Sequence, residues 1–442
     1  MATRKSHQKT RYGCSPCKKR RIKCDQNQPS CQNCAKRGLD CSYYMIRPVS
    51  GPSIAPFATQ ENKPSATVQI LDTKADILSP PLSPSLPFDI IESIYPSCSD
   101  LLRRRFRELI HHFEVRTSST LATDPPAQRV WKTVVPTLAA VTPCILHGII
   151  AVSAMHFARS LSNGKEKDIY LQIAAAQMNI GLSQYRTGLE DITEDNAEAL
   201  FAFSVLTTTY VWVTATDECR EVLSSLKLKG LCVERKEEVK MKLSSMMTKT
   251  LRALRGCLVI LTPCWTRVST GVLSAIVNRS WWPQSRYPTS PLAIEEDRMV
   301  HSIERMWVRP GRRYEYCLDT LASSLKLLRE VFALVSLLTM DANACGDPTP
   351  TGTLTDRGAM FVWPTQVSLD FVSLLEQNRP EAWVILAHFA ILPGRVKGVW
   401  WLDGMASPMV AAAALIAGKE SRNFIEWPMR EVGGDLDEIL SS

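Results

Sequence analysis

The sequence predicts a mostly α-helical protein with a small cysteine-rich module at its amino terminus and an extended linker behind that module. Three observations predict this organisation. Six of the 14 cysteines lie between Cys14 and Cys41, and nine prolines lie between Pro48 and Ser99. From Asp100 onward, apolar residues recur three and four positions apart, a spacing that places them on one face of an α-helix.

Composition and charge distinguish the amino-terminal segment from the rest of the chain. The 442 residues are 45% hydrophobic and 22% charged, which is typical of a globular protein and excludes a wholly disordered chain. Residues 1–47 hold 12 Lys and Arg against two Asp, a net charge of +10, whereas the remaining residues carry −2. A short basic segment on a nearly neutral body indicates a surface that binds nucleic acid or another anion.

The clustered cysteines of this segment have a metal-ligand spacing. They form two copies of one pattern: Cys14-x2-Cys17-x6-Cys24 and Cys31-x2-Cys34-x6-Cys41. The first ten residues lack the apolar run of a secretory signal, so we expect a reducing compartment, where clustered cysteines bind metal. A zinc ion takes four ligands, so six thiolates hold two zinc ions only if two of them bridge.

The repeat predicts which cysteines bridge. Cys14 and Cys31 lead the two halves and can each reach both metals, so one ion would take Cys14, Cys17, Cys24 and Cys31. The second ion would take Cys14, Cys31, Cys34 and Cys41. The alternative, a single-zinc ribbon built around Cys17 and Cys34, leaves Cys24 and Cys41 without a role.

The amino-terminal segment resembles a known family. All six cysteine spacings, Pro29 between the two halves and the basic run from Cys17 to Cys24 are similar to the fungal zinc binuclear cluster (Zn₂Cys₆) transcription factors. The resemblance implies a nuclear, sequence-specific DNA-binding protein with two zinc ions, acting on RNA polymerase II genes, that reads CGG-type half-sites in the major groove of double-stranded DNA.

The basic run supplies the candidate DNA contacts. Five positive charges lie in the six positions from Lys18 to Lys23. Guanine offers two major-groove acceptors to Arg, and we expect Arg20 and Arg21, at the family's reading positions, to contact base edges. The other cations should bind phosphates, which fix register without reading sequence; they are Lys18, Lys19, Lys23, Lys36 and Arg37. For Lys36 and Arg37 the alternative is a solvated charge.

Three zones follow from these patterns. Residues 1–47 are the expected DNA-binding module, residues 48–99 a Pro/Ser-rich disordered linker and residues 100–442 an all-α regulatory domain. Within the last zone, apolar stripes predict helices such as the one from Leu102 to Phe113. Gly and Pro clusters such as Asp124-Pro125-Pro126 and Pro393-Gly394 should separate the helices.

One apolar stretch is long enough to cross a membrane. Thr133 to Ala158 contains no Asp, Glu, Lys or Arg over 26 residues, more than the ~20 that a bilayer requires. Pro136 and Pro143 interrupt it, and the charge-free stretch from Leu200 to Thr216 is shorter. Both stretches therefore favour buried helices of a soluble protein without a membrane partner.

Nothing in the body indicates an enzyme. The remaining eight cysteines are scattered among apolar residues, as small buried side chains are. His111 and His112 are adjacent, so on a helix they point about 100° apart and cannot share a metal. No glycine-rich phosphate loop, HExxH or GxSxG motif occurs, so no catalytic residues are assigned.

Several segments of the body resemble the helical regulatory domain of sterol uptake control-type regulators. They include Glu108 to Phe113, Leu146 to His156, Arg379 to Ala390, Trp400 to Gly404 and Ile425 to Pro428. Little is recognisable between Arg220 and Val300, where helices of the family are expected to be altered or missing. The resemblance implies an all-α bundle that forms a homodimer and binds a small lipid-like ligand; a helical scaffold without a ligand is the alternative.

We therefore predict a nuclear, zinc-dependent transcription regulator of a fungal metabolic pathway or secondary-metabolite gene cluster. Two other hypotheses remain open at this stage. In one, the cluster protein acts mainly through protein interaction and its basic segment serves nuclear import. In the other, it is a regulator that responds to a sterol or another lipid.

Overall fold

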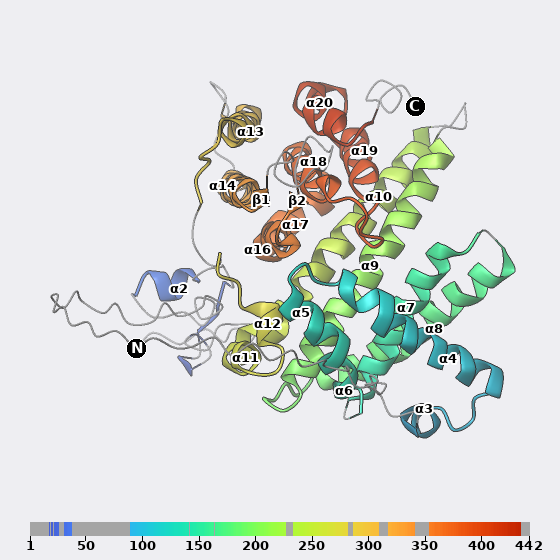
Figure 1. Ribbon diagram of the computed structural model, residues 1–442. Coiled ribbons are helices and arrows are strands. Elements are labelled where there is room, and N and C mark those ends of the chain that lie inside the picture. The colour runs from blue at the N-terminus through green and yellow to red at the C-terminus, as the bar shows by residue number, and fades with distance from the viewer. Residues whose placement is uncertain are drawn as a thin grey trace, which may run out of the picture.

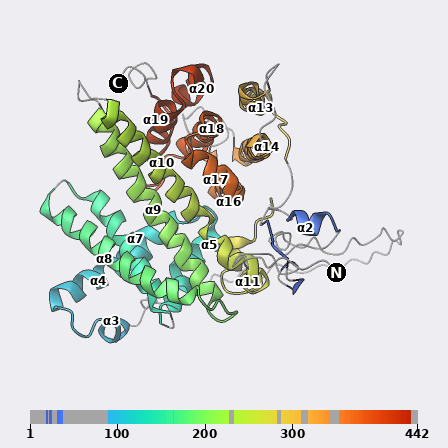
Figure 2. The ribbon, with the colours of Figure 1, turned by 180° about the vertical axis from the view of Figure 1, so that it is seen from behind.

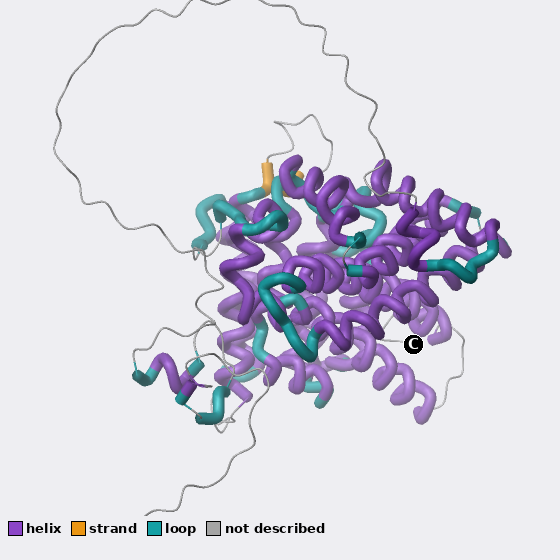
Figure 3. Tube along the Cα trace, turned by 90° about the horizontal axis from the view of Figure 1, so that it is seen from below, coloured by secondary structure: helices purple, strands orange, loops and turns teal. Residues whose placement is uncertain are grey.

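Helices form nearly all the regular structure that the computed structural model describes (Figures 1 and 3). The described residues are 17, 19–20, 22–25, 31–37, 89–140, 142–162, 164–226, 233–281, 286–308, 317–340 and 353–434. Among them, only β1 (Thr339–Met340) and β2 (Thr353–Leu354) are extended strands; they pair antiparallel, with Thr339 opposite Leu354. The predicted mostly α fold class is confirmed. Residues 48–88 of the predicted linker lie outside the described residues.

The amino-terminal half of the body begins earlier than expected. Helix α3 (Asp89–Ile94) lies inside the range predicted to be linker. Ile91 belongs to the main core, as does Tyr95, whose hydroxyl lies 2.8 Å from His147 Nδ1 and 2.5 Å from Gln177 Oε1. The predicted linker is therefore wrong at its carboxyl end, because these apolar and aromatic side chains attach residues 91–95 to the core.

Local sequence signals explain the next helices. Ser99 caps α4 (Asp100–His112) by accepting a hydrogen bond from the Leu102 amide, and Asp124 caps α5 in the same way from Ala127. The elements of this half follow in order: α4, a π-helix (Phe113–Thr117), a 3₁₀ helix (Ser118–Thr120), α5 (Pro125–Arg129), a second π-helix (Val130–Val134), α6 (Val135–Leu138), α7 (Pro143–Ser160) and α8 (Lys165–Gly188).

The charge-free stretch Thr133–Ala158 forms two helical segments rather than one span; the first is partly buried and the second, α7, is mostly buried. Pro143 occupies the first turn of α7, where a missing N–H costs nothing. Most of α7 is buried against α8 and α9 (Ala197–Leu226). Helix α9 is long and apolar enough by composition to cross a membrane, yet 67% of its most apolar window is buried inside the body, as expected of a core helix.

Glycines allow α7, α8 and α9 to approach closely. A Cβ at Gly181 of α8 would lie 2.7 Å from the Phe203 ring, and one at Gly148 of α7 would lie 3.0 Å from the same ring. Phe203, on α9, is fully buried. One aromatic ring therefore fills a notch that two glycines create on neighbouring helices.

Helices α9 and α10 (Val233–Gly256) pack against each other through the middle of the body (Figures 1 and 2). Most of α3–α8 lies on one side of this pair and most carboxy-terminal helices lie on the other (Figure 1), but the two sides also touch, since the His156 ring of α7 stacks on Trp400. Helix α10 is followed by α11 (Leu258–Thr270) and α12 (Ser274–Val277). Helices therefore occupy much of the range 220–300 where little was recognisable, so the helices expected there are not missing; that they are altered stays a prediction.

The carboxy-terminal half packs on the other side of this pair. It comprises α13 (Pro291–His301), a 3₁₀ helix (Ser302–Met306), α14 (Cys317–Leu337), the two short strands, a 3₁₀ helix (Arg357–Phe361), α16 (Val362–Gln366), α17 (Leu369–Glu376), α18 (Pro380–Arg395), α19 (Ala406–Ala417), a 3₁₀ helix (Lys419–Ser421) and α20 (Arg422–Glu431). Pro393-Gly394 does not separate helices as predicted, because Pro393 lies inside the last turn of α18.

Candidate metal centre and nucleic-acid interface

The described cysteines of the amino-terminal module gather into a small cluster of their own. Cys17, Cys24, Cys31 and Cys34 are buried, and the half-buried Ile22 packs against them. The cluster is separate from the main hydrophobic core. Cys14 and Cys41 lie outside the described residues.

The sulfur geometry fits shared metal coordination. The Sγ atoms of Cys17, Cys24 and Cys31 all lie within 4.8 Å of one another, and those of Cys17 and Cys31 are 3.6 Å apart. A disulfide would require about 2.05 Å. Two thiolates on one tetrahedral zinc, each at about 2.3 Å from it, lie roughly 3.8 Å apart. The same three cysteines belong to the first predicted ion, whereas Cys34 belongs to the second.

Hydrogen bonds join the two halves of the module. The backbone amide of Gln32 donates to Asp25 Oδ2 (3.1 Å), and Asn33 Nδ2 donates to the carbonyl oxygen of Lys23 (2.8 Å). Helix α2 (Gln32–Ala35) carries Cys34, and Cys31 is its N-cap residue. Sequence reasoning missed Asp25 and Asn33, because the repeat that relates the cysteines does not single out either residue.

The basic residues of the module are neighbours of these cysteines in the sequence. Lys19, Lys23, Lys36 and Arg37 are exposed, and Arg20 is half-buried. Lys18 and Arg21 lie outside the described residues. The backbone of Ile22 donates to the carbonyl oxygen of Cys17 (3.1 Å), so the basic run turns back toward its own metal ligand. The exposed cations are thereby held next to the buried sulfurs, where they can meet a phosphate backbone.

The other described cysteines are ordinary thiols within the body. Cys144 and Cys219 are buried, and burial raises the pKa of each thiol to about 12. A thiol with such a pKa does not ionise near neutrality and is a poor nucleophile. Cys232 and Cys345 lie outside the described residues.

Comparison with known proteins decides the family. The family model described as "Fungal Zn(2)-Cys(6) binuclear cluster domain" matches residues 12–48, and that of "Fungal specific transcription factor domain" matches residues 108–227. The Zn(2)-C6 fungal-type transcription factor afumD of Aspergillus fumigatus is 30% identical over 394 residues, covering 88% of this chain and 87% of the relative. The chain belongs to the Zn(2)-C6 fungal-type transcription factors.

A second long relative supports this assignment. A Zn(2)-C6 fungal-type transcription factor of Gibberella zeae is 26% identical over 466 residues, covering 97% of this chain and 87% of the relative. As a member of this family, the protein is a transcription factor, as predicted, and not an enzyme. Sterol uptake control protein 2 of Candida albicans is 65% identical, but over 40 residues, or 9% of this chain and 6% of the relative.

The residues present fit the metals that this family requires. The Zn(2)-C6 module binds two zinc ions, and its described thiolates are buried together without a disulfide. Zinc bound there supplies no catalysis; it stabilises a module with little apolar core of its own. The positions of Cys17, Cys24 and Cys31 are the observation on which this fit rests.

Proposed function

We propose that this transcription factor reads CGG-type half-sites in the major groove through Arg20 and Arg21. Two metal-linked halves hold the basic run at its Cys17 and Cys24 ends, so the charges of the run cannot fold back onto an apolar core. Lys18, Lys19, Lys23, Lys36 and Arg37 bind the flanking phosphates. The observation that supports this best is the exposure of Lys19 and Lys23 beside the buried sulfurs.

The test is duplex preference in the full-length, zinc-loaded chain. Arg20→Ala combined with Arg21→Ala should lower the affinity for CGG-containing duplexes relative to scrambled duplexes, at a cost of about 1–3 kcal/mol per base contact. Arg103→Ala combined with Arg104→Ala, in α4 of the body, is the matched control and should leave the preference unchanged. An unaltered preference in the Arg20/Arg21 variant would defeat the assignment.

The zinc content of the chain tests how the six cysteines are divided between the two ions. We propose that Cys14 and Cys31 bridge two zinc ions, with Cys17 and Cys24 completing one site and Cys34 and Cys41 the other. The full chain should then contain two zinc ions. A single zinc per chain would contradict the bridged arrangement.

The chain's organisation and setting are also part of the proposal. Residues 1–47 are the DNA-binding module, and the regulatory domain begins near Asp89 rather than Asp100 because Ile91 and Tyr95 are in the core. The protein acts in the nucleus as a homodimer and regulates a metabolic or secondary-metabolite gene cluster. Genome-wide occupancy would give the target genes, the motif and the half-site spacing together.

A role through protein interaction alone is the competing hypothesis. It predicts that the chain binds zinc but shows no preference among duplexes. The all-α domain is also proposed to receive a small ligand, for which the family resemblance implies a lipid-like molecule; a cavity between its helices offers the space for a small ligand of this or another class.

A further inference from the structure

The body contains a cavity of about 390 Å³ beside helix α9. Phe201, Val205, Thr208, Thr209 and Trp212 of α9 line it; their spacing of four, seven, eight and eleven residues from Phe201 places them on one face of the helix. Helices α10, α11, α12, α14 and α16 form further parts of the wall, together with residues 121–123, 279–281, 356–361 and Trp401. The volume is at the small end of the roughly 300–1,000 Å³ typical of small-molecule sites.

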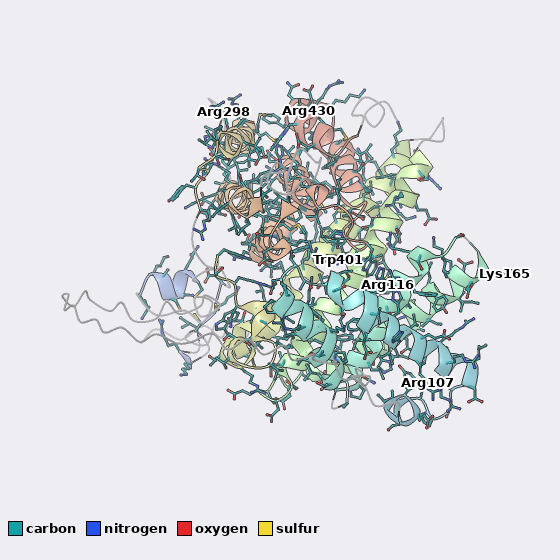
Figure 4. The ribbon with its side chains drawn as sticks, viewed as in Figure 1. Arg107, Arg116, Lys165, Arg298, Trp401 and Arg430 are labelled. Carbon is teal, nitrogen blue, oxygen red and sulfur yellow. The ribbon has the colours of Figure 1, made fainter. Side chains whose placement is uncertain are left out.

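The wall is rich in flat aromatic side chains. Six of them face the cavity: Phe201, Trp212, Trp265, Trp281, Phe361 and Trp401. The centroid of the Phe361 ring lies 5.8 Å from the ring centroids of Trp212 and Trp401. The Phe361 ring is nearly perpendicular to that of Trp212 and stacked on that of Trp401. Trp401 lies in the interior of the body in Figure 4, whereas the labelled Lys165 and Arg298 lie at its periphery. Aromatic walls favour flat ligands, which stack on rings in offset or edge-to-face geometry.

The charged residues that line the cavity balance one another. They are Arg279, Arg357, Glu330 and Asp356. Arg279 pairs with Asp124 and Asp356. Arg357 donates to the backbone carbonyl oxygens of Thr120 (3.0 Å) and Ala122 (2.8 Å). Both guanidinium groups are therefore already engaged, and the Glu330 carboxylate would repel an anion. This arrangement favours a neutral ligand.

One buried polar atom in the wall has no partner. The Trp212 side chain is 1% exposed, and its Nε1–H donates to no group among the described residues. By contrast, Trp281 Nε1 donates to Asp356 Oδ2 (2.8 Å), and Trp401 Nε1 donates to the carbonyl oxygen of Thr120 (3.0 Å). Leaving a buried donor unpaired is costly, and a ligand with an acceptor oxygen would remove that cost.

We propose that this cavity binds a neutral, flat aromatic molecule whose carbonyl oxygen accepts a hydrogen bond from Trp212 Nε1. The proposal rests on the small-ligand function proposed above and assigns it a site and a ligand class. The class differs from an acyl chain, which would not use the stacked aromatic walls, and from an organic anion, which the charge balance disfavours.

The probe is 6-propionyl-2-(dimethylamino)naphthalene, a neutral aromatic ketone whose fluorescence shifts to the blue in apolar surroundings. Titrated into the full-length, zinc-loaded chain, it should bind saturably at one site. Trp212→Phe keeps the ring and removes the donor, so the affinity should fall about 3- to 10-fold, as expected for one hydrogen bond. Val205→Phe fills the cavity without changing the donor and should lower the affinity more than tenfold.

Trp427→Phe is the matched control, because Trp427 lies outside the cavity and its Nε1 donates to Glu431 Oε1 (3.1 Å). It should bind the probe as the unsubstituted chain does. Thermal unfolding of each variant verifies folding. No saturable binding, or equal affinity in the Val205→Phe and Trp427→Phe variants, would overturn the proposal.

Competing ligands test the proposed ligand class separately from the proposed ligand-binding function and from DNA recognition. Neutral 9,10-anthraquinone should displace the probe, whereas palmitate and cholesterol should not. Displacement by palmitate or cholesterol but not by anthraquinone would refute the aromatic class. Lipid binding that Val205→Phe leaves intact would refute this site while preserving a ligand function elsewhere. Binding to CGG duplexes, measured on the same samples, reports on DNA recognition independently of either result.

Discussion

At the residue scale, the contact of Phe203 with two glycines determines how closely three helices pack. A methyl group at Gly181 would lie 2.7–2.8 Å from ring atoms of Phe203, which is shorter than real Cβ contacts. The ring is fully buried, so it cannot swing into solvent. Because protein interiors are close-packed, such a clash must shift a helix rather than a side chain.

We expect Gly181→Ala to destabilise the chain by about 1–3 kcal/mol, as overpacked cores are. Chemical denaturation of the full chain measures the effect. Gly256→Ala, at the end of α10, is the matched control because no atom lies within 4 Å of its added Cβ. It should be neutral or slightly stabilising, since Ala favours helix over Gly. Equal effects of the two substitutions would show that the notch is not tightly filled.

A second prediction at the residue scale concerns the stability of the fold at acidic pH. Burial lowers the pKa of His388 to about 4, and its Nδ1 lies 2.8 Å from the Val384 carbonyl oxygen. In the unfolded chain, His388 takes up a proton near the ordinary pKa of 6.5. In the folded chain, His388 stays neutral until the pH approaches 4. Stability is therefore fully present above pH 6.5 and falls as the pH decreases toward 4, by roughly 2–3 kcal/mol.

Urea denaturation at pH 7, 5.5 and 4.5 checks this dependence. His388→Asn removes the titrating group while keeping a donor near Val384, so its stability should fall less than that of the unsubstituted chain over this range. His111→Asn, at an exposed position of α4, should retain the original slope. A His388→Asn variant with the same slope would show that other groups control acid unfolding.

At the element scale, the amino-terminal module depends on its metals. Its described helix, α2, has four residues, and its buried apolar contacts are the cysteines and Ile22. So short a helix is unstable by itself in water. The helices of the body, in contrast, share a large continuous core.

Removing zinc should therefore abolish DNA binding and leave the helicity of the body intact. Excess chelator, followed by circular dichroism at 222 nm and duplex binding on one sample, tests both outcomes. Cys17→Ser should lower the zinc content, whereas Cys98→Ser, at a half-buried position outside the cluster, should not. Persistent duplex binding in the chelated chain would contradict a metal-dependent module.

The sequence predicts elements far better than the sites formed between them. The apolar stripe from Leu102 predicts α4, and the charge-free stretch Thr133–Ala158 predicts buried helices, because both signals are local. The predicted helix break at Pro393-Gly394 was wrong, since a proline is tolerated in the last turn of α18 once packing on α19 and α20 stabilises the helix. The zinc cluster was recognisable because its ligands lie within 28 positions of one another. The cavity was not, because its wall joins residues from Leu121 to Trp401.

At the scale of the whole molecule, the net positive charge is concentrated at the amino-terminal end of the sequence. Residues 1–47 carry +10 before metal binding, while the rest carries −2. Two zinc ions and six thiolates add −2 together, so the module stays strongly positive. Affinity for DNA should therefore depend steeply on salt through this segment alone.

The salt dependence can be assigned to particular side chains. If the exposed Lys36 and Arg37 each bind one phosphate, replacing both by Ala should reduce the slope of log K against log[salt] by about 1.8 per module. Lys165→Ala combined with Lys419→Ala, two exposed positions of the body, should leave the slope unchanged. An unchanged slope in the Lys36/Arg37 variant would identify those charges as solvated rather than bound.

The order of the cavity-lining residues along the chain also has a consequence for biosynthesis. The wall of the cavity starts with Leu121 and Phe201, but Phe361 and Trp401 complete it. Ribosomes deliver the amino-terminal part first, so a nascent or prematurely terminated chain would display the aromatic face of α9 uncovered. Such chains should be captured by chaperones or aggregate, and frameshifts late in the coding sequence should therefore remove the regulator rather than release a shortened, unregulated one.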